Sequence, residues 1–168
     1  MRLRSAVRSS CPAMGFTLIE LMVVVAIATI LFSIAIPSYM TYIRQSRRTE
    51  AKTAVLDLAG REERFLSTNP TAYTNDPLNL GYPAVPGFPA TVGSGYYSLN
   101  VCVVPPAASC PPSAIATAPS YTVTATPVPG QSQVNDTQCT SFSVDSAGQQ
   151  YANGSGGAAV ATPYCWGN

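Results

Sequence analysis

The stretch from residue 15 to residue 37, GFTLIELMVVVAIATILFSIAIP, decides the fold of this chain. Between Phe16 and Ile36 it carries one charged residue, Glu20. A helix needs about 20 consecutive apolar residues to cross the hydrocarbon core of a bilayer, and this run is long enough. Three arginines lie in the short segment before it. We therefore expect an apolar helix that lies in a membrane or packs against other apolar helices.

Two general interpretations of this helix leave something unexplained. A plain membrane anchor accounts for its length but not for Glu20, because a carboxylate inside a bilayer costs about 2.5–3.5 kcal/mol on insertion scales. An ordinary secretory signal with its cleavage site at Ser33-Ile34-Ala35 has the arginine-bearing start. Its apolar core is longer than the usual length of about 7–15 residues, however, and Glu20 again has no role.

A third interpretation explains both the charge and the length. The motif Gly15-Phe16-Thr17-Leu18-Ile19-Glu20 resembles the class III signal of type IV prepilins. The resemblance implies that residues 1–15 are a leader, which a prepilin peptidase removes on the cytoplasmic side by cutting between Gly15 and Phe16. It also implies N-methylation of the new terminal Phe16 and retention of the apolar helix. Basic residues flank both ends of the helix, so this orientation comes from the resemblance and not from a count of charges.

Glu20 acquires a role in this interpretation. Cleavage creates an ammonium group on Phe16, and a charge in hydrocarbon is less costly when it is paired. The resemblance implies that Glu20 of one subunit neutralises the Phe16 amine of a neighbour and thereby sets the register of assembly. Two alternatives stay open, in which Glu20 pairs with the amine of its own chain or extends to the lipid headgroups.

The helix is expected to continue well beyond the membrane. Pro37 ends or kinks helices, and we expect a kink there because the residues after it are helix formers. Residues 16–43 are the hydrophobic membrane or filament-core part and residues 44–66 its amphipathic continuation. At about 1.5 Å per residue the helix would be roughly 75 Å long.

The continuation has one apolar face. Ala51, Val55, Leu58 and Phe65 recur at a spacing of three or four residues, with Ala54 and Glu62 beside them. On another face Asp57 and Arg61 form an acid-first pair four residues apart. We expect the apolar face to pack on a sheet.

The rest of the chain predicts a small antiparallel sheet, and hence an α+β fold. Residues 67–95 contain repeated proline and glycine turn signals and are expected to form a loop between helix and sheet, the αβ-loop. Residues 96–168 are expected to hold three or four strands and a C-terminal region closed by a disulfide. The strands are expected at 96–104, 120–128, 139–144 and 149–152, with Pro127 at a strand end or edge and a hairpin turn at 145–148.

The cysteines favour an oxidising compartment. Of the five in the chain, Cys11 falls in the expected leader, which leaves an even number. We favour the sequence-adjacent disulfides Cys102–Cys110 and Cys139–Cys165, although four cysteines permit three connectivities. In type IV pilins the region between two C-terminal cysteines is exposed and variable, and Cys139–Cys165 resembles that region.

A narrower resemblance covers most of the chain. Residues 46–74, the segments YYSLNV and SYTVTATP and the dipeptide Cys165-Trp166 are similar to the PilE-type minor pilins of Gram-negative bacteria. This implies a structural subunit of a type IV pilus that primes or supports fibre assembly. Its implied partners are other pilin subunits, the prepilin peptidase and the inner-membrane assembly platform. Before assembly the chain would be a single-pass inner-membrane protein with a periplasmic globular domain, and afterwards part of an extracellular pilus.

Other functions fit less well. The chain has no histidine, nucleophile–base pair or phosphate-binding glycine loop, so we expect no enzyme activity, cofactor or metal. No lysine or arginine follows Arg64, so we expect no DNA binding. The acids Asp76, Asp136 and Asp145 are too scattered for the calcium site common in type II secretion pseudopilins. A major pilin, a pseudopilin and a DNA-uptake pilin remain the alternatives, and no residue selects among adhesion, twitching motility and competence.

Overall fold

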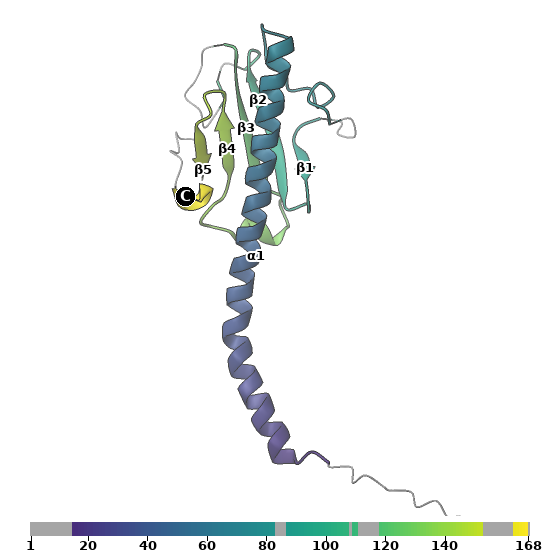
Figure 1. The fold of residues 1–168 in the computed structure, drawn as a ribbon, viewed down its shortest axis with the longest axis vertical. Coiled ribbons are helices and arrows are strands. Elements are labelled where there is room, and N and C mark those ends of the chain that lie inside the picture. Colours follow the sequence, from purple (N-terminus) through teal and green to yellow (C-terminus); the bar gives the residue numbers. More distant parts are fainter. Residues whose placement is uncertain (1–14, 83–86, 108, 111–117, 153–162, 168) are drawn as a thin grey trace, which may run out of the picture. The chain divides into compact units, whose positions relative to one another are not determined.

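The chain forms two compact units, residues 1–40 and residues 41–168. The computed structural model describes residues 15–82, 87–107, 109–110, 118–152 and 163–167. Helix α1, Leu18–Thr68, begins in the first unit and ends in the second. The second unit also contains a sheet, the 3-10 helix η1 (Ser132–Asn135) and the short helix α2 (Pro163–Trp166) (Figure 1).

Both ends of α1 follow from local sequence. Thr17 is the N-cap, and its Oγ1 accepts a hydrogen bond of 3.3 Å from the backbone N–H of Glu20. At the other end Asn69 donates its N–H to the carbonyl of Phe65, and Pro70 follows. The long helix predicted from the sequence is therefore confirmed, with each end shifted by two residues. Pro37 lies inside α1, and the kink there stays a prediction.

In the first unit α1 is apolar and uncovered. Its most apolar window has a mean hydropathy of 2.7, and none of that window is buried within the chain. Among the described residues it is the one helix that is long and apolar enough to cross a membrane. Such a surface requires lipid or other helices around it.

The sheet of the second unit is an antiparallel meander of five strands in the order β1-β2-β3-β4-β5 (Figure 1). Its strands are β1 (Ala90–Val92), β2 (Tyr97–Val104), β3 (Ser120–Pro127), β4 (Phe142–Asp145) and β5 (Gln150–Ala152). Pro127 is the last residue of β3, so its missing N–H interrupts no hydrogen bond inside the strand. The predicted turn at 145–148 joins β4 to β5, with the Gly148 N–H bonded to the Asp145 carbonyl.

The sheet has more strands than the three or four expected from the sequence. The extra strand, β1, lies in the region 67–95 that was expected to be a loop. It forms because a glycine turn reverses the chain: Gly93 and Gly95 both have positive φ, and the Gly95 N–H bonds to the Val92 carbonyl at 3.0 Å. Val92 then pairs with Tyr97 on β2.

The strand expected at 139–144 was predicted to begin too early. It begins at Phe142, because the backbone N–H groups of Gln138 and Cys139 donate to the carboxylate of Asp136 and not to a neighbouring strand. Local side-chain acceptors compete with a strand for backbone donors in this way.

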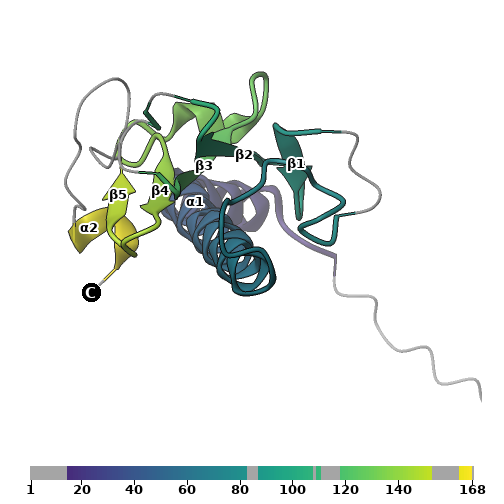
Figure 2. The same ribbon diagram turned by 90° about the horizontal axis from the view of Figure 1, so that it is seen from above.

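The core lies between α1 and one face of the sheet, which the view from above shows (Figure 2). The predicted apolar face of α1 supplies Ala51, Val55 and Leu58, each fully buried. Full burial of one such valine or leucine side chain contributes about 1.5–3 kcal/mol. The sheet supplies Ala152 from β5 and the following side chains from its three central strands: Tyr97, Leu99, Val101, Val103, Tyr121, Val123, Ala125, Phe142 and Val144.

Glu62 is an ionisable residue on this buried face of α1. It is fully buried, with one carboxylate oxygen accepting the Thr74 N–H at 3.2 Å and the other without a partner. Burial, and then the negative charge of Glu63, raise the pKa of Glu62 to about 7, while the Thr74 N–H acts in the opposite direction. The groups that face it from other elements are the tyrosines Tyr73 and Tyr121.

Glu62→Gln is expected to stabilise the second unit at alkaline pH. The folded carboxyl keeps its proton up to pH about 7, whereas the unfolded carboxyl, with its ordinary pKa of 4.5, releases it earlier. The wild-type free energy of unfolding should thus fall relative to that of Glu62→Gln as pH rises from 4.5 to 7, by about 3 kcal/mol in total.

The measurement is urea unfolding of the full chain in detergent across this pH range, followed by fluorescence. Trp166 is the single tryptophan, and its ring packs against Phe142, so the signal reports on the second unit. Glu20→Gln removes the same charge from an exposed position in the first unit and serves as the control. A constant difference in stability between wild type and Glu62→Gln over this range would contradict the assignment.

Candidate functional site

The expected cleavage position is open to an enzyme. Gly15 and Phe16 precede the first helical residue, and both are exposed, Phe16 by 81%. The peptide bond between them is therefore outside the hydrogen-bonded part of α1. A peptidase that needs an extended substrate would reach this bond without unwinding the helix.

Glu20 stands at the third position of α1, where a carboxylate interacts favourably with the helix dipole. Its backbone N–H is bonded to Thr17, but its exposed carboxylate has no ion pair or hydrogen bond among the described residues. One chain taken alone thus leaves a carboxylate exposed within an otherwise apolar segment. That carboxylate is available to a cation from outside the chain.

The structure has both disulfides that the sequence favoured. Cys102 on β2 is joined to Cys110, and Cys139 to Cys165 on α2. The second bond is buried at both ends and closes the C-terminal region. Cys11, expected in the leader, lies outside the described residues.

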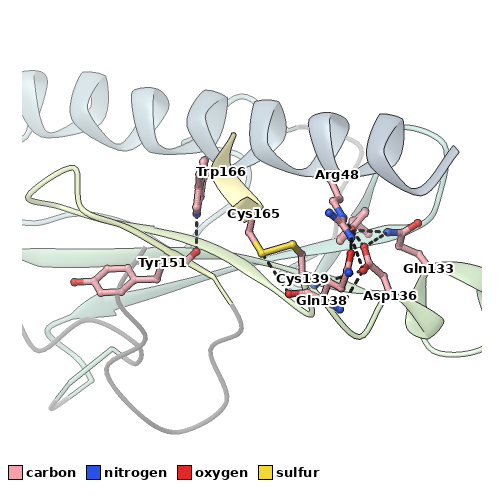
Figure 3. The surroundings of a disulfide bond; sticks show 9 residues. Arg48, Gln133, Asp136, Gln138, Cys139, Tyr151, Cys165 and Trp166 are labelled. Atoms are coloured by element: carbon pink, nitrogen blue, oxygen red, sulfur yellow. Dashed lines mark hydrogen bonds and ion pairs between the residues drawn. A yellow bond between two sulfur atoms is a disulfide. The ribbon is translucent and has the colours of Figure 1, made fainter. Parts of the chain in front are cut away.

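A buried ion pair between Arg48 on α1 and Asp136 connects the start of this C-terminal region to the helix (Figure 3). The Arg48 guanidinium donates to both carboxylate oxygens of Asp136, at 2.6 and 2.7 Å. Gln133 donates to the same carboxylate, as do the backbone N–H groups of Gln138 and Cys139. The side chains of Arg48 and Asp136 are almost fully buried, and such a charge is tolerated only when it is paired and hydrogen-bonded. This pair therefore ties the residues leading to Cys139 to the helix.

The far end of the disulfide-bounded segment is also anchored. Trp166, next to Cys165, donates its indole N–H to the Tyr151 carbonyl at 2.8 Å (Figure 3). Its ring meets the Phe142 ring edge-on, with the centroids 5.8 Å apart. Because Tyr151 is on β5, this contact and the disulfide hold α2 against the last strand of the sheet.

Sequence reasoning did not identify the role of Asp136. It grouped Asp136 with Asp76 and Asp145 as scattered acids, and each of them accepts hydrogen bonds within the second unit. Asp136 is 88 residues from Arg48, so no local pattern reveals the pair. Among the described residues, no group of three or more potential ligand side chains gathers around a metal position.

Several basic side chains of α1 are engaged by the domain itself. Arg47 lies over the Tyr96 ring at 3.4 Å and donates to the Ser132 hydroxyl. Arg61 forms the predicted pair with Asp57 at 2.7 Å and stacks on Tyr82. Asp57 thus neutralises Arg61, whereas Arg47 keeps its charge and is held against the domain by neutral partners.

Two family models match the chain. Residues 37–143, more than half of the chain, match the family described as "Type IV minor pilin ComP, DNA uptake sequence receptor". Residues 15–36 match the prokaryotic N-terminal methylation motif. The second match begins at the glycine of the expected cleavage position and covers the apolar run.

Curated relatives match over shorter stretches. The type IV major pilin protein PilA of Myxococcus xanthus is 49% identical over 53 residues, 32% of this chain and 24% of that protein. The fimbrial protein EcpC of Eikenella corrodens is 39% identical over 82 residues, 49% of each chain. A type IV major fimbrial protein FimA of Dichelobacter nodosus is 46% identical over 63 residues, 31% of this chain and 39% of that protein.

The matched stretches thus span half or less of these relatives' lengths, whereas the ComP model alone covers most of the second unit. The methylation motif accounts for the apolar start of the helix that precedes it. On these grounds the chain belongs to the type IV pilin family, and within it to the ComP group.

Proposed function

We propose that this chain is a minor pilin, a low-copy subunit that primes or supports assembly of a type IV pilus. The observation that carries the proposal is the uncovered apolar part of α1 with the unpaired carboxylate of Glu20. A surface of this kind is stable only among lipids or other apolar helices. The minor role is supported by the description of the matching family and by the resemblance to PilE-type minor pilins.

The processing steps belong to the same proposal. A prepilin peptidase cuts between Gly15 and Phe16 and methylates the Phe16 amine, and residues 1–15 are lost. The ammonium of Phe16 then pairs with Glu20 of a neighbouring subunit as the helix leaves the lipid. The chain is a single-pass inner-membrane protein before assembly, engages the assembly platform, and afterwards lies in the extracellular fibre.

The proposed role in assembly predicts that residue 20 must carry a negative charge. Glu20→Gln should still be cleaved and methylated at Phe16 and should accumulate in the membrane, because neither the cleavage position nor the second unit is altered. It should be depleted at least roughly tenfold from sheared fibres, since its neighbour's ammonium would lack a partner in an apolar surrounding. N-terminal sequencing and quantitative mass spectrometry of sheared fibres measure both properties.

Thr29→Ala, which removes an uncharged polar group from the same apolar run, is the control and should be incorporated normally. In wild-type fibres this chain should be scarce compared with a major subunit, and its deletion should lower fibre number without blocking enzyme secretion. Normal incorporation of Glu20→Gln would refute the pairing. A dominant copy number would identify a major pilin, and loss of secretion a pseudopilin.

A DNA receptor is the second candidate function, favoured by the description of the ComP family. The distribution of charge opposes it. Residues 65–168 have no lysine or arginine, and Arg47, Arg48 and Arg61 on α1 contact partners within the domain. Duplex binding at physiological salt rests on neutralising several phosphates with free basic side chains.

We therefore expect no DNA binding by the globular domain, residues 41–168. The measurement is a gel shift with duplex DNA at two salt concentrations, with a basic DNA-binding domain as positive control. A retarded band that weakens as salt rises would overturn this expectation and favour the receptor. The fibre-assembly proposal would stand, because it rests on the first unit.

A further inference from the structure

A small polar pocket in the second unit lies beside the Arg48–Asp136 pair and contains Arg44, for which no role is described above. It has a volume of about 240 Å³ and lies between the start of this unit's part of α1 and the residues that follow η1. Its lining residues include Thr41, Arg44, Arg48, Asn135, Asp136 and Thr137.

The charges around this pocket do not cancel. Arg48 and Asp136 neutralise each other through two hydrogen bonds. Arg44 has no ion pair among the described residues, and its Nε is inaccessible to solvent and without a hydrogen-bond partner. Because Asp136 neutralises Arg48 alone, the charge of Arg44 leaves the pocket with one net positive charge. The unsatisfied Nε adds an unfavourable term for Arg44 in this arrangement.

The chemistry of the lining fits an oxyanion. A guanidinium presents several N–H donors in a planar fork that matches the oxygens of a phosphate. The hydroxyl of Thr137 and the amide of Asn135, both on exposed residues, add donors at the rim. A phosphodiester carries one negative charge, which Arg44 would neutralise.

The position of Arg44 in the chain indicates where this phosphate comes from. It is the first charged residue after Glu20, and 28 residues, 16–43, separate it from the expected leader. As a helix these residues span about 42 Å, close to the roughly 40–45 Å thickness of a bilayer with its headgroups. A chain anchored with Phe16 at one surface would thus bring residue 44 to the headgroups of the other.

We propose that the Arg44 pocket binds the phosphate of an anionic phospholipid headgroup while the chain is anchored in the membrane. The inference rests on membrane anchoring, not on a particular role in the fibre. A lipid headgroup suits the site better than DNA does. One recessed arginine supplies a single phosphate contact, whereas duplex binding uses several.

The experiment uses the full chain in a phosphate-free detergent, titrated with short-chain phosphatidylglycerol and followed by phosphorus NMR. Wild type should bind, and Arg44→Gln should bind about tenfold more weakly or worse, because a charge-assisted contact is lost. Arg64→Gln removes the same charge from an exposed position on α1 and should bind like wild type. Arg44→Lys keeps the charge without the planar fork and should fall in between.

Three further titrations, with phosphatidylcholine, inorganic phosphate and duplex DNA, identify the source of the phosphate. Phosphatidylcholine of the same chain length should bind more weakly than phosphatidylglycerol, and inorganic phosphate at equal concentration should not displace the lipid. Equal binding by Arg44→Gln would overturn the proposal, as would displacement by inorganic phosphate or Arg44-dependent binding of duplex DNA. Trp166 fluorescence checks that each variant is folded, so a loss of binding in a folded Arg44→Gln supports the site.

Discussion

The apolar surface of the first unit is the constraint on which the rest of this protein depends. Side chains such as Leu18, Ile34 and Phe16 are 78%, 68% and 81% exposed, and nothing described in the chain covers them. Covering one such side chain is worth about 1.5–3 kcal/mol, so the whole segment cannot remain in water. Lipid and neighbouring helices are similarly apolar, however, so hydrophobic burial alone does not select a register in a fibre. A polar pair such as Glu20 with an ammonium is specific to one register, because every other register leaves two charges unpaired in an apolar surrounding.

The part of α1 in the second unit contains two buried ionisable groups, Arg48 and Glu62. Burying a charge is costly, and this cost is reduced differently at each group. Arg48 keeps its charge because Asp136 matches it with two short hydrogen bonds. Glu62 has no ion-pair partner in the part of the chain that the structure describes and receives one N–H, from Thr74, so burial raises its pKa to about 7. Each group also binds the backbone of a segment outside the sheet, directly at Thr74 or through Asp136 at Cys139. The helix therefore positions both the αβ-loop and the disulfide-bounded region by polar contacts, while the sheet packs on it mainly through apolar side chains.

The sequence predicted the parts of the fold that local patterns specify. The apolar run is recognised by its length and composition. The amphipathic helix and the strands are recognised by their periods, which are the three-to-four spacing of Ala51, Val55 and Leu58 and the alternation along each strand. The structure confirms the helix and these strands. Strand β1 was missed because three residues are too few for a period, although the glycine turn after it was a readable sign. The pair Arg48–Asp136 could not be predicted, because partners 88 residues apart are brought together only when the segment around η1 folds back to α1. The pocket at Arg44 depends on the same tertiary arrangement.

The ion pair also determines which charges remain available on the domain. Without Asp136 the start of the second unit would present Arg44 and Arg48 together, a surface suited to a polyanion. Because Asp136 neutralises Arg48, one cationic group is left in a recess of about 240 Å³, which is enough for one phosphate and too little for a phosphate backbone. Residues 65–168 carry no basic side chain, so the sheet and C-terminal region add nothing to this charge. The arrangement of charge therefore favours a contact at the membrane surface over one along a nucleic acid.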